Sequence, residues 1–155
     1  MAAMEMLWKE EVGNGISALV NEATTIMVSS VDEHGYPNTK QMFKMKHDGL
    51  ETFWFSTNTS SMRVKQFQRN PHASLYFVGK SNGLMLVGDM KVRQDRDSKE
   101  WLWVEGSEKY YPLGVEDPDY CVLEFVAKTA NYYGSLQKYI FDIKEWKPYA
   151  LSILR

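Results

Sequence analysis

Apolar and polar residues alternate along most of the chain, with the period of two that is typical of β-strands with one buried face. Short stretches rich in glycine, asparagine, aspartate or serine separate these segments. The segments expected to form strands are residues 25–31, 38–46, 51–56, 72–78, 84–94, 120–127 and 131–143. Turns are expected at residues 32–35, 47–49 and 80–83, which favours antiparallel hairpins. Gly88, inside the fifth segment, predicts a bulge or a close approach, as at a barrel corner.

Other segments follow a helical period. Near the N-terminus, apolar residues share one helical face and predict a helix over about residues 4–22. These residues are Met4, Leu7, Trp8, Val12, Ile16, Leu19 and Val20. Gly13 and Gly15 weaken this helix and are candidates for a break into two pieces.

Two further helices are expected. One covers residues 62–69, buries Val64 and Phe67, and ends at Asn70-Pro71. The other runs through Val104 and is capped by Asp97 or Ser98. About seven strands with two or three helices predict a mainly β fold, an antiparallel barrel that is closed or nearly closed, in one domain over residues 1–155.

The composition narrows the class of protein. The 155 residues are 44% hydrophobic and 25% charged, and the formal net charge of −2 argues against a protein built to grip nucleic acid or an anionic membrane. No apolar run approaches the roughly 20 residues of a membrane span, and the acidic N-terminal segment is not a signal peptide. A single cysteine, Cys121, suits a reducing compartment, so the expected location is cytoplasmic.

The segment from Phe55 to Pro71 predicts a place for a phosphate group. An aromatic strand end runs into hydroxyl and amide residues, 56–60, and then into the helix that carries Arg63 in its first turn. Backbone N–H groups, hydroxyls, the helix dipole and a guanidinium are the groups that bind phosphate. The alternative is an ordinary capped helix with solvated basic residues.

Motifs for other chemistry are absent. The sequence has no GxGxxG or Walker motif, no nucleophile elbow, and no CxxC or HExxH. Its three histidines, His34, His47 and His72, are scattered, so no metal site is expected.

The segment from Phe55 to Pro71 resembles the flavin-phosphate segment of the pyridoxamine 5′-phosphate oxidase-like FMN-binding split barrels. Further similarities extend over roughly residues 8–143. They are Asp32-Glu-His-Gly-Tyr-Pro37, Lys40-Gln-Met42, residues 84–92, Tyr111-Pro-Leu-Gly and Asp117-Pro-Asp119, the last two resembling the general stress protein 26 branch. The resemblance implies an antiparallel split β-barrel that binds FMN in a cleft between the two subunits of a homodimer.

The resemblance also implies site residues. Lys40, Gln41 and Met42 would lie along the flavin, and Lys46 would reach its phosphate. A plain alternative for residues 40–46 is a solvated lysine face over a buried face of Gln41, Phe43 and Met45. The phosphate segment contributes Phe55, Ser56, Thr57, Ser60, Ser61 and Arg63, and Tyr133 would meet the flavin of the partner subunit.

Three departures from the oxidase pattern bear on function. Met62 stands where the oxidase has a second basic residue, and Gly83 stands where it has a glutamine. The oxidase's C-terminal Arg/His substrate motif has no counterpart in residues 134–155. Pyridoxamine phosphate is therefore not expected to be the substrate.

The expected function is an FMN-dependent oxidoreductase in which the flavin transfers hydride or electrons, with NADH or NADPH as candidate donor. Five tryptophans and nine tyrosines exceed what one small core needs and favour an obligate interface. One rival is a non-catalytic flavin-binding or stress-related binding protein. A second is an oligonucleotide-binding barrel that uses the lysines and aromatic residues, against which the acidic balance counts.

Overall fold

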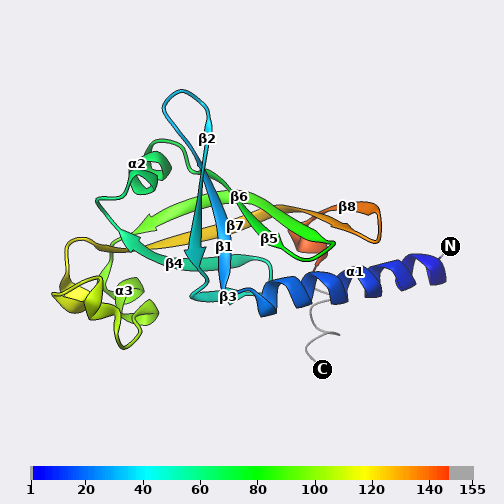
Figure 1. The fold of residues 1–155 in the computed structure, drawn as a ribbon, viewed down its shortest axis with the longest axis horizontal. Helices are drawn as coiled ribbons and strands as arrows, with labels where there is room; N and C mark the ends of the chain where they lie inside the picture. Colours follow the sequence, from blue (N-terminus) through cyan, green and yellow to red (C-terminus); the bar gives the residue numbers. More distant parts are fainter. Residues whose placement is uncertain (1, 147–155) are drawn as a thin grey trace.

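The centre of the molecule is one antiparallel sheet of eight strands, in a computed structural model that describes residues 2–146. The strands are β1 (Thr25–Val31), β2 (Pro37–Phe43), β3 (Lys46–Asp48), β4 (Thr52–Asn58), β5 (His72–Val78), β6 (Gly83–Arg93), β7 (Tyr120–Gly134) and β8 (Gln137–Asp142). They follow in the order β2-β1-β5-β6-β7-β4-β3, with β8 paired to β7. The sheet curls into a half barrel (Figure 1), which confirms the expected antiparallel split-barrel fold class.

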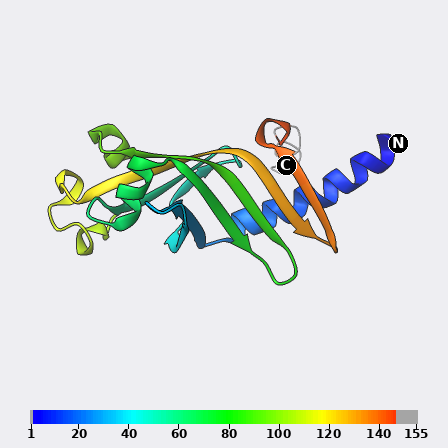
Figure 2. The same cartoon turned by 90° about the horizontal axis from the view of Figure 1, so that it is seen from above.

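Helices lie at both ends of this sheet. They are α1 (Ala2–Glu22), α2 (Met62–Arg69), α3 (Arg96–Leu102) and short 3-10 helices at Ser107–Lys109, Gly114–Glu116 and Ile143–Glu145. In both views α1 extends from one end of the sheet, while α2 and α3 lie at the other (Figures 1 and 2). Within residues 2–146, no helix is both long enough and apolar enough to span a membrane.

Alternation along the strands builds the core. Ile26 and Val28 of β1 are 1% and 2% exposed, and their neighbours in the strand are half-buried. Phe53 and Phe55 of β4 are fully buried in the same core, which α2 covers with Val64 and Phe67. Residues of opposite pleat therefore face away from the core, as period two requires.

The N-terminal helix is continuous, so Gly13 and Gly15 do not divide it. A Cβ atom at Gly15 would lie 2.3 Å from the Tyr132 hydroxyl, so this glycine permits close packing of α1 on β7. Val12, Ile16 and Val20 are buried as the pattern indicates, whereas the side chains of Met4, Leu7 and Trp8 lie outside the described part of the chain. The third helix is capped by the Asp95 carboxylate, which accepts from the Ser98 backbone N–H, so the expected caps were wrong.

The strand expected over residues 38–46 is interrupted after Phe43. At this break the Lys44 ammonium donates to the carbonyls of Val20 (2.7 Å) and Asn21 (3.2 Å), the open end of α1, and burial lowers the Lys44 pKa. Lys46 then begins β3, and the turn falls after His47 rather than at it. β4 continues to Asn58, so the hydroxyl-rich turn is shorter than expected.

In place of the last two expected strands, the structure has one long strand, β7, which a hairpin joins to β8. β7 runs from Tyr120 to Gly134, and its register with β6 shifts where Val87 pairs with Thr129 and Gly88 with Ala127. The extra residue, Lys128, is in β7, so the bulge lies opposite Gly88, and Gly88 itself permits the close approach of the Val126 backbone. The hairpin to β8 turns at Ser135 and Leu136, which both have positive φ (52° and 62°).

Candidate functional site

An open groove of about 670 Å³ lies where β2, the end of β4 and the start of α2 meet. It brings together six of the residues expected to hold a flavin: Lys40, Gln41, Met42, Ser56, Thr57 and Arg63. These residues come from three elements far apart in the sequence, so the fold gathers them into one place. The remaining wall is formed by Thr25, Phe43, Asn58, Tyr110 and Tyr111.

Arg63 is the fixed cation of this groove. Its Nη1 donates to the Thr57 hydroxyl at 2.6 Å, and Thr57 itself is only 4% exposed. Partial burial lowers the Arg63 pKa, while nearby Tyr111 and Cys121 act in the opposite direction. A guanidinium that is already oriented and partly desolvated binds an anion more strongly than a free surface arginine does.

The start of α2 lacks a partner for a polar group. Ser61 is the N-cap residue, but its side chain makes no capping hydrogen bond. Its Oγ is buried and, within the described chain, has no hydrogen-bond partner. A buried hydroxyl without a partner is costly, but Ser61 is not among the residues that line the groove.

The turn before α2 is already occupied by the protein's own carboxylate. Asp119 accepts from the Ser60 backbone N–H (2.9 Å), the Asn58 amide (2.7 Å) and the Thr59 hydroxyl (3.0 Å). These hydrogen bonds, that from Asn58 being the largest contribution, lower the Asp119 pKa to about 2. The Ser60 N–H is thus already bound and is not available to an incoming anion.

Tyr111 closes the groove from the segment after α3. Its side chain is 4% exposed, and its ring centre lies 4.7 Å from that of Tyr120. Burial raises the Tyr111 pKa. Tyr110 and Phe43, which also line the groove, are 57% and 67% exposed, so two aromatic side chains of the groove are largely uncovered.

The side chains of β2 do not follow the alternative expectation of a solvated lysine face over a buried face. Met42, on the same face as Lys40, is buried at 8%, whereas Phe43 on the other face is exposed. Gln41 is exposed and donates to the Thr25 hydroxyl at 3.0 Å. The idea of a solvated lysine face over a buried Phe43 is therefore wrong.

Several expected site residues lie elsewhere. The Lys46 ammonium donates to the Trp101 carbonyl at 2.7 Å and sits 4.2 Å from that ring's centre, outside the groove lining. Phe55 is fully buried in the core, and the Ser60 side chain is exposed beside the Asp119 contact. Tyr133 is 39% exposed on β7, pairs with Gly83 and is not among the residues that line the groove.

Sequence reasoning did not assign the roles of Phe43, Asn58, Tyr110, Tyr111 and Asp119. The Asn58–Asp119 contact joins residues 61 positions apart. The Asp117-Pro-Asp119 similarity pointed to this segment, but it could not show which residue Asp119 contacts.

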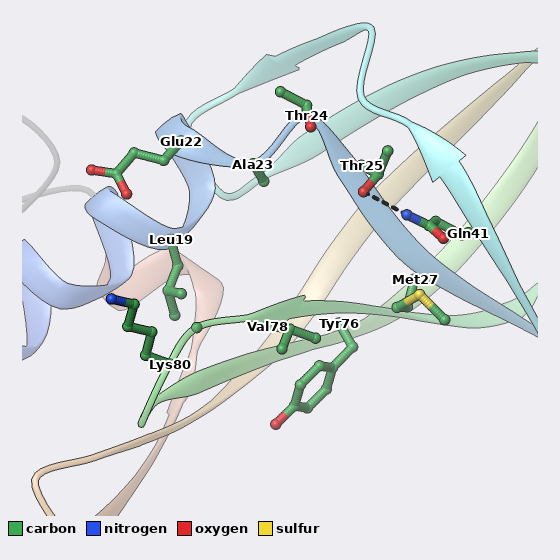
Figure 3. A pocket seen from close by; sticks show the side chains of 11 residues that line it. Leu19, Glu22, Ala23, Thr24, Thr25, Met27, Gln41, Tyr76, Val78 and Lys80 are labelled. Atoms are coloured by element: carbon green, nitrogen blue, oxygen red, sulfur yellow. Dashed lines mark hydrogen bonds between the residues drawn. The ribbon is translucent and has the colours of Figure 1, made fainter.

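A second hollow of about 610 Å³ adjoins the groove (Figure 3). Both hollows include Thr25 and Gln41, whose hydrogen bond forms the boundary between them. Met27, Tyr76 and Val78 line the second hollow on the outward side of the sheet.

Comparisons with known proteins identify the family. A family model described as "Pyridoxamine 5′-phosphate oxidase like" matches residues 11–148. The chain belongs to this family. Within it, a protein from Clostridium acetobutylicum related to general stress protein 26 of B. subtilis is 46% identical, with a TM-score of 0.80 over 88% of this chain and 98% of that one.

A more distant curated relative and a structural neighbour are less similar to this chain. The pyridoxine/pyridoxamine 5′-phosphate oxidase of Escherichia coli O9:H4 is 29% identical over 111 residues, 63% of this chain and 50% of that protein. The chain spans about half the length of the curated relatives it matches. A heme-binding protein from Mycobacterium smegmatis shares the fold at 12% identity and a TM-score of 0.68, over 92% of this chain and 60% of that one.

Proposed function

We propose that this pyridoxamine 5′-phosphate oxidase-like protein binds FMN in the groove between β2, β4 and α2. The observation that carries the proposal is Arg63 at the start of α2, which lines the groove, is oriented by the Thr57 hydroxyl and lies two residues after the Ser61 N-cap. Lys40 supplies a second cation to the groove. A phosphate in the groove would accept hydrogen bonds from Arg63 and Lys40, while the Ser60 backbone N–H is already bound to Asp119.

The rest of the groove suits a ribityl chain and a planar ring. Ser56 and Thr57 offer hydroxyls at the phosphate side, while Gln41 and Met42 line the other part of the groove. Phe43 and Tyr110 present exposed aromatic faces that a flat ring would cover. Bound FMN would supply hydride or electron transfer, and the protein's own residues would bind and orient it.

The proposed activity is that of an FMN-dependent oxidoreductase with NADH or NADPH as candidate donor. Pyridoxamine phosphate is not the proposed substrate, because the oxidase's Arg/His motif has no counterpart in the sequence of residues 134–155. The alternative is a non-catalytic flavin-binding protein. Adding NADH or NADPH without oxygen separates the two: bleaching of the bound flavin supports the oxidoreductase. A flavin that stays oxidised supports the alternative. A cytoplasmic location belongs to the proposal and is supported by the unpaired, buried Cys121.

A homodimer is also part of the proposal, since one face of the sheet is apolar and exposed. Register places Met27, Tyr76, Met85, Asn131 and Ile140 in one row across five strands. Residues directly opposite in antiparallel strands point to the same face. The row and its neighbours leave large apolar side chains exposed: Tyr76 (42%), Val78 (75%), Val87 (39%), Tyr133 (39%) and Ile140 (74%).

A second copy is the proposed occupant of this face. The face continues into the second hollow, which shares Thr25 and Gln41 with the groove, so a subunit covering it would also border the flavin. Tyr133 and Gly83, adjacent in register, would then approach the groove of the partner. An exposed apolar surface of this extent is typical of an interface.

Ligand titration tests the proposed cofactor. Purified apoprotein is titrated separately with FMN, riboflavin, FAD and hemin, following flavin fluorescence or heme absorbance. The proposal expects FMN to bind at least about tenfold more tightly than riboflavin, the minimum for one charge-assisted hydrogen bond to phosphate. Equal affinity for FMN and riboflavin, or saturable binding of hemin alone, would overturn it.

A further inference from the structure

Gln66 is a buried polar residue on the inner side of α2, and it is 5% exposed. Its Oε1 accepts two hydrogen bonds, from the Ser30 hydroxyl at 2.5 Å and from the Asn38 amide at 3.0 Å. Both donors belong to the β1–β2 hairpin, beside which α2 lies in Figure 1. Gln66 therefore ties the helix directly to the hairpin.

This tie is the directional part of the helix contact. Val64 and Phe67 bury α2 in the core, but apolar contacts have no preferred direction and permit small rotations or shifts. Ser30 and Asn38 are opposite each other in the hairpin register, so the two donors converge on one oxygen. Hydrogen bonds from two fixed donors restrict both the height and the rotation of the helix.

The tie lies next to both cations of the groove. Arg63 precedes Gln66 by three residues, so the two side chains share one side of the helix. Lys40 follows Asn38 by two residues, so those two share one face of β2. The Gln66–Asn38 hydrogen bond thus joins the element that carries Arg63 to the element that carries Lys40.

We infer that Gln66 is a positioning residue for phosphate selectivity: it holds α2 at the distance from β2 at which Arg63 and Lys40 engage one phosphate monoester. The inference rests on the proposed FMN function and deepens it. A helix released from the hairpin keeps its core contacts but no longer presents both cations in one geometry. Affinity for the phosphate then falls, while contacts to the flavin ring on β2 are retained.

The test measures how much the phosphate group contributes to FMN affinity in the wild type and in matched variants. The quantity is the ratio of the riboflavin dissociation constant to the FMN dissociation constant, measured by fluorescence titration at fixed salt. Gln66→Met keeps length and burial but removes the acceptor. Gln68→Met makes the same chemical change at an exposed position of α2, and Phe67→Leu weakens the core contact without touching the tie.

Gln66→Met is expected to lower the ratio about 5- to 20-fold, most of the effect of one charge-assisted hydrogen bond, while riboflavin affinity changes by less than about twofold. Both controls should keep the wild-type ratio even where Phe67→Leu lowers the melting temperature. Asn38→Ala removes a donor from the hairpin side and should lower the ratio in the same way, and this variant decides if Gln66→Met does not fold.

Two failures are distinguishable. A wild-type ratio near one overturns the proposed phosphate site and this inference with it. A high wild-type ratio that persists in folded Gln66→Met overturns the inference alone and leaves Gln66 as a purely structural residue.

Discussion

The Asp119 carboxylate lies 2.9 Å from the backbone nitrogen of Ser60 and accepts its hydrogen bond. An internal anion therefore occupies the turn that an incoming phosphate would otherwise use. The same carboxylate binds Asn58 and Thr59, so it fastens the segment carrying Tyr110 and Tyr111 to the end of β4. One wall of the groove depends on this contact.

We expect the Asp119 contact to give the protein acid-sensitive stability. The folded-state pKa is lowered to about 2 from an ordinary value of 3.8, so the folded state binds this proton less readily than the unfolded chain. The contribution is present above about pH 3.8 and is lost as the pH falls toward 2. Urea unfolding of wild type and Asp119→Asn should differ at pH 6 and converge near pH 2. Asp48→Asn, an exposed carboxylate on β3, is the matched control, and curves of constant separation across this range would contradict the assignment.

Arg63→Ala should weaken FMN binding with little change in fold. A hydrogen bond from a charged group contributes roughly 1.5–3 kcal/mol, so the FMN dissociation constant should rise about 10- to 150-fold. Riboflavin affinity should hardly change, because that ligand has no phosphate. Lys65→Ala, exposed on the same helix, is the control and should stay within about twofold. Circular dichroism checks folding, and an unchanged FMN affinity in Arg63→Ala would remove the phosphate site.

Much of this architecture could be predicted from the sequence where the pattern is local. Alternation located β1, β5 and β6, and helical spacing located α2 with Val64 and Phe67 buried. The β7–β8 hairpin was missed because its turn uses Ser135 and Leu136 at positive φ, positions where glycine or asparagine is the usual signal.

The site was predictable only in part for a related reason. Residues 40–42, 56, 57 and 63 come from continuous segments that carry a resemblance, and the fold brings them together. Lys46 was expected at the phosphate. The strand is interrupted after Phe43, however, and the Lys46 ammonium donates to the Trp101 carbonyl. Asp119 and Gln66 act through partners at least 28 residues away, and no local pattern reports such contacts.

Gly88→Ala should destabilise the protein through a steric clash. A Cβ atom at Gly88 would lie 2.0 Å from the Val126 carbonyl oxygen and 2.9 Å from the Ala127 Cα, both of which are backbone atoms. Backbone atoms in the middle of a sheet cannot shift without breaking the strand pairing. We therefore expect the free energy of unfolding to fall by about 2–3 kcal/mol. Gly35→Ala is the comparison: its φ of +84° adds strain of about 1–2 kcal/mol, but nothing lies within 4 Å. Equal urea midpoints for Gly88→Ala and wild type would show that the bulge accommodates a side chain.

The dimer prediction can be tested at a single exposed residue. Light scattering at micromolar concentration should report about twice the 18.0 kDa chain mass for wild type. Val78 is 75% exposed on the apolar outer face, so Val78→Glu would place an unpaired charge in the proposed interface. Burying such a charge costs several kcal/mol, enough to raise the dimer dissociation constant by at least about 100-fold and leave mostly monomer. Leu113→Glu, at a similar exposure of 70% in the segment after α3, should remain dimeric. Because the partner subunit would border the flavin, FMN affinity should fall together with dimerisation in Val78→Glu. A wild-type monomer that binds FMN with full affinity would contradict the shared site, and a dimeric Val78→Glu would place the interface on another face.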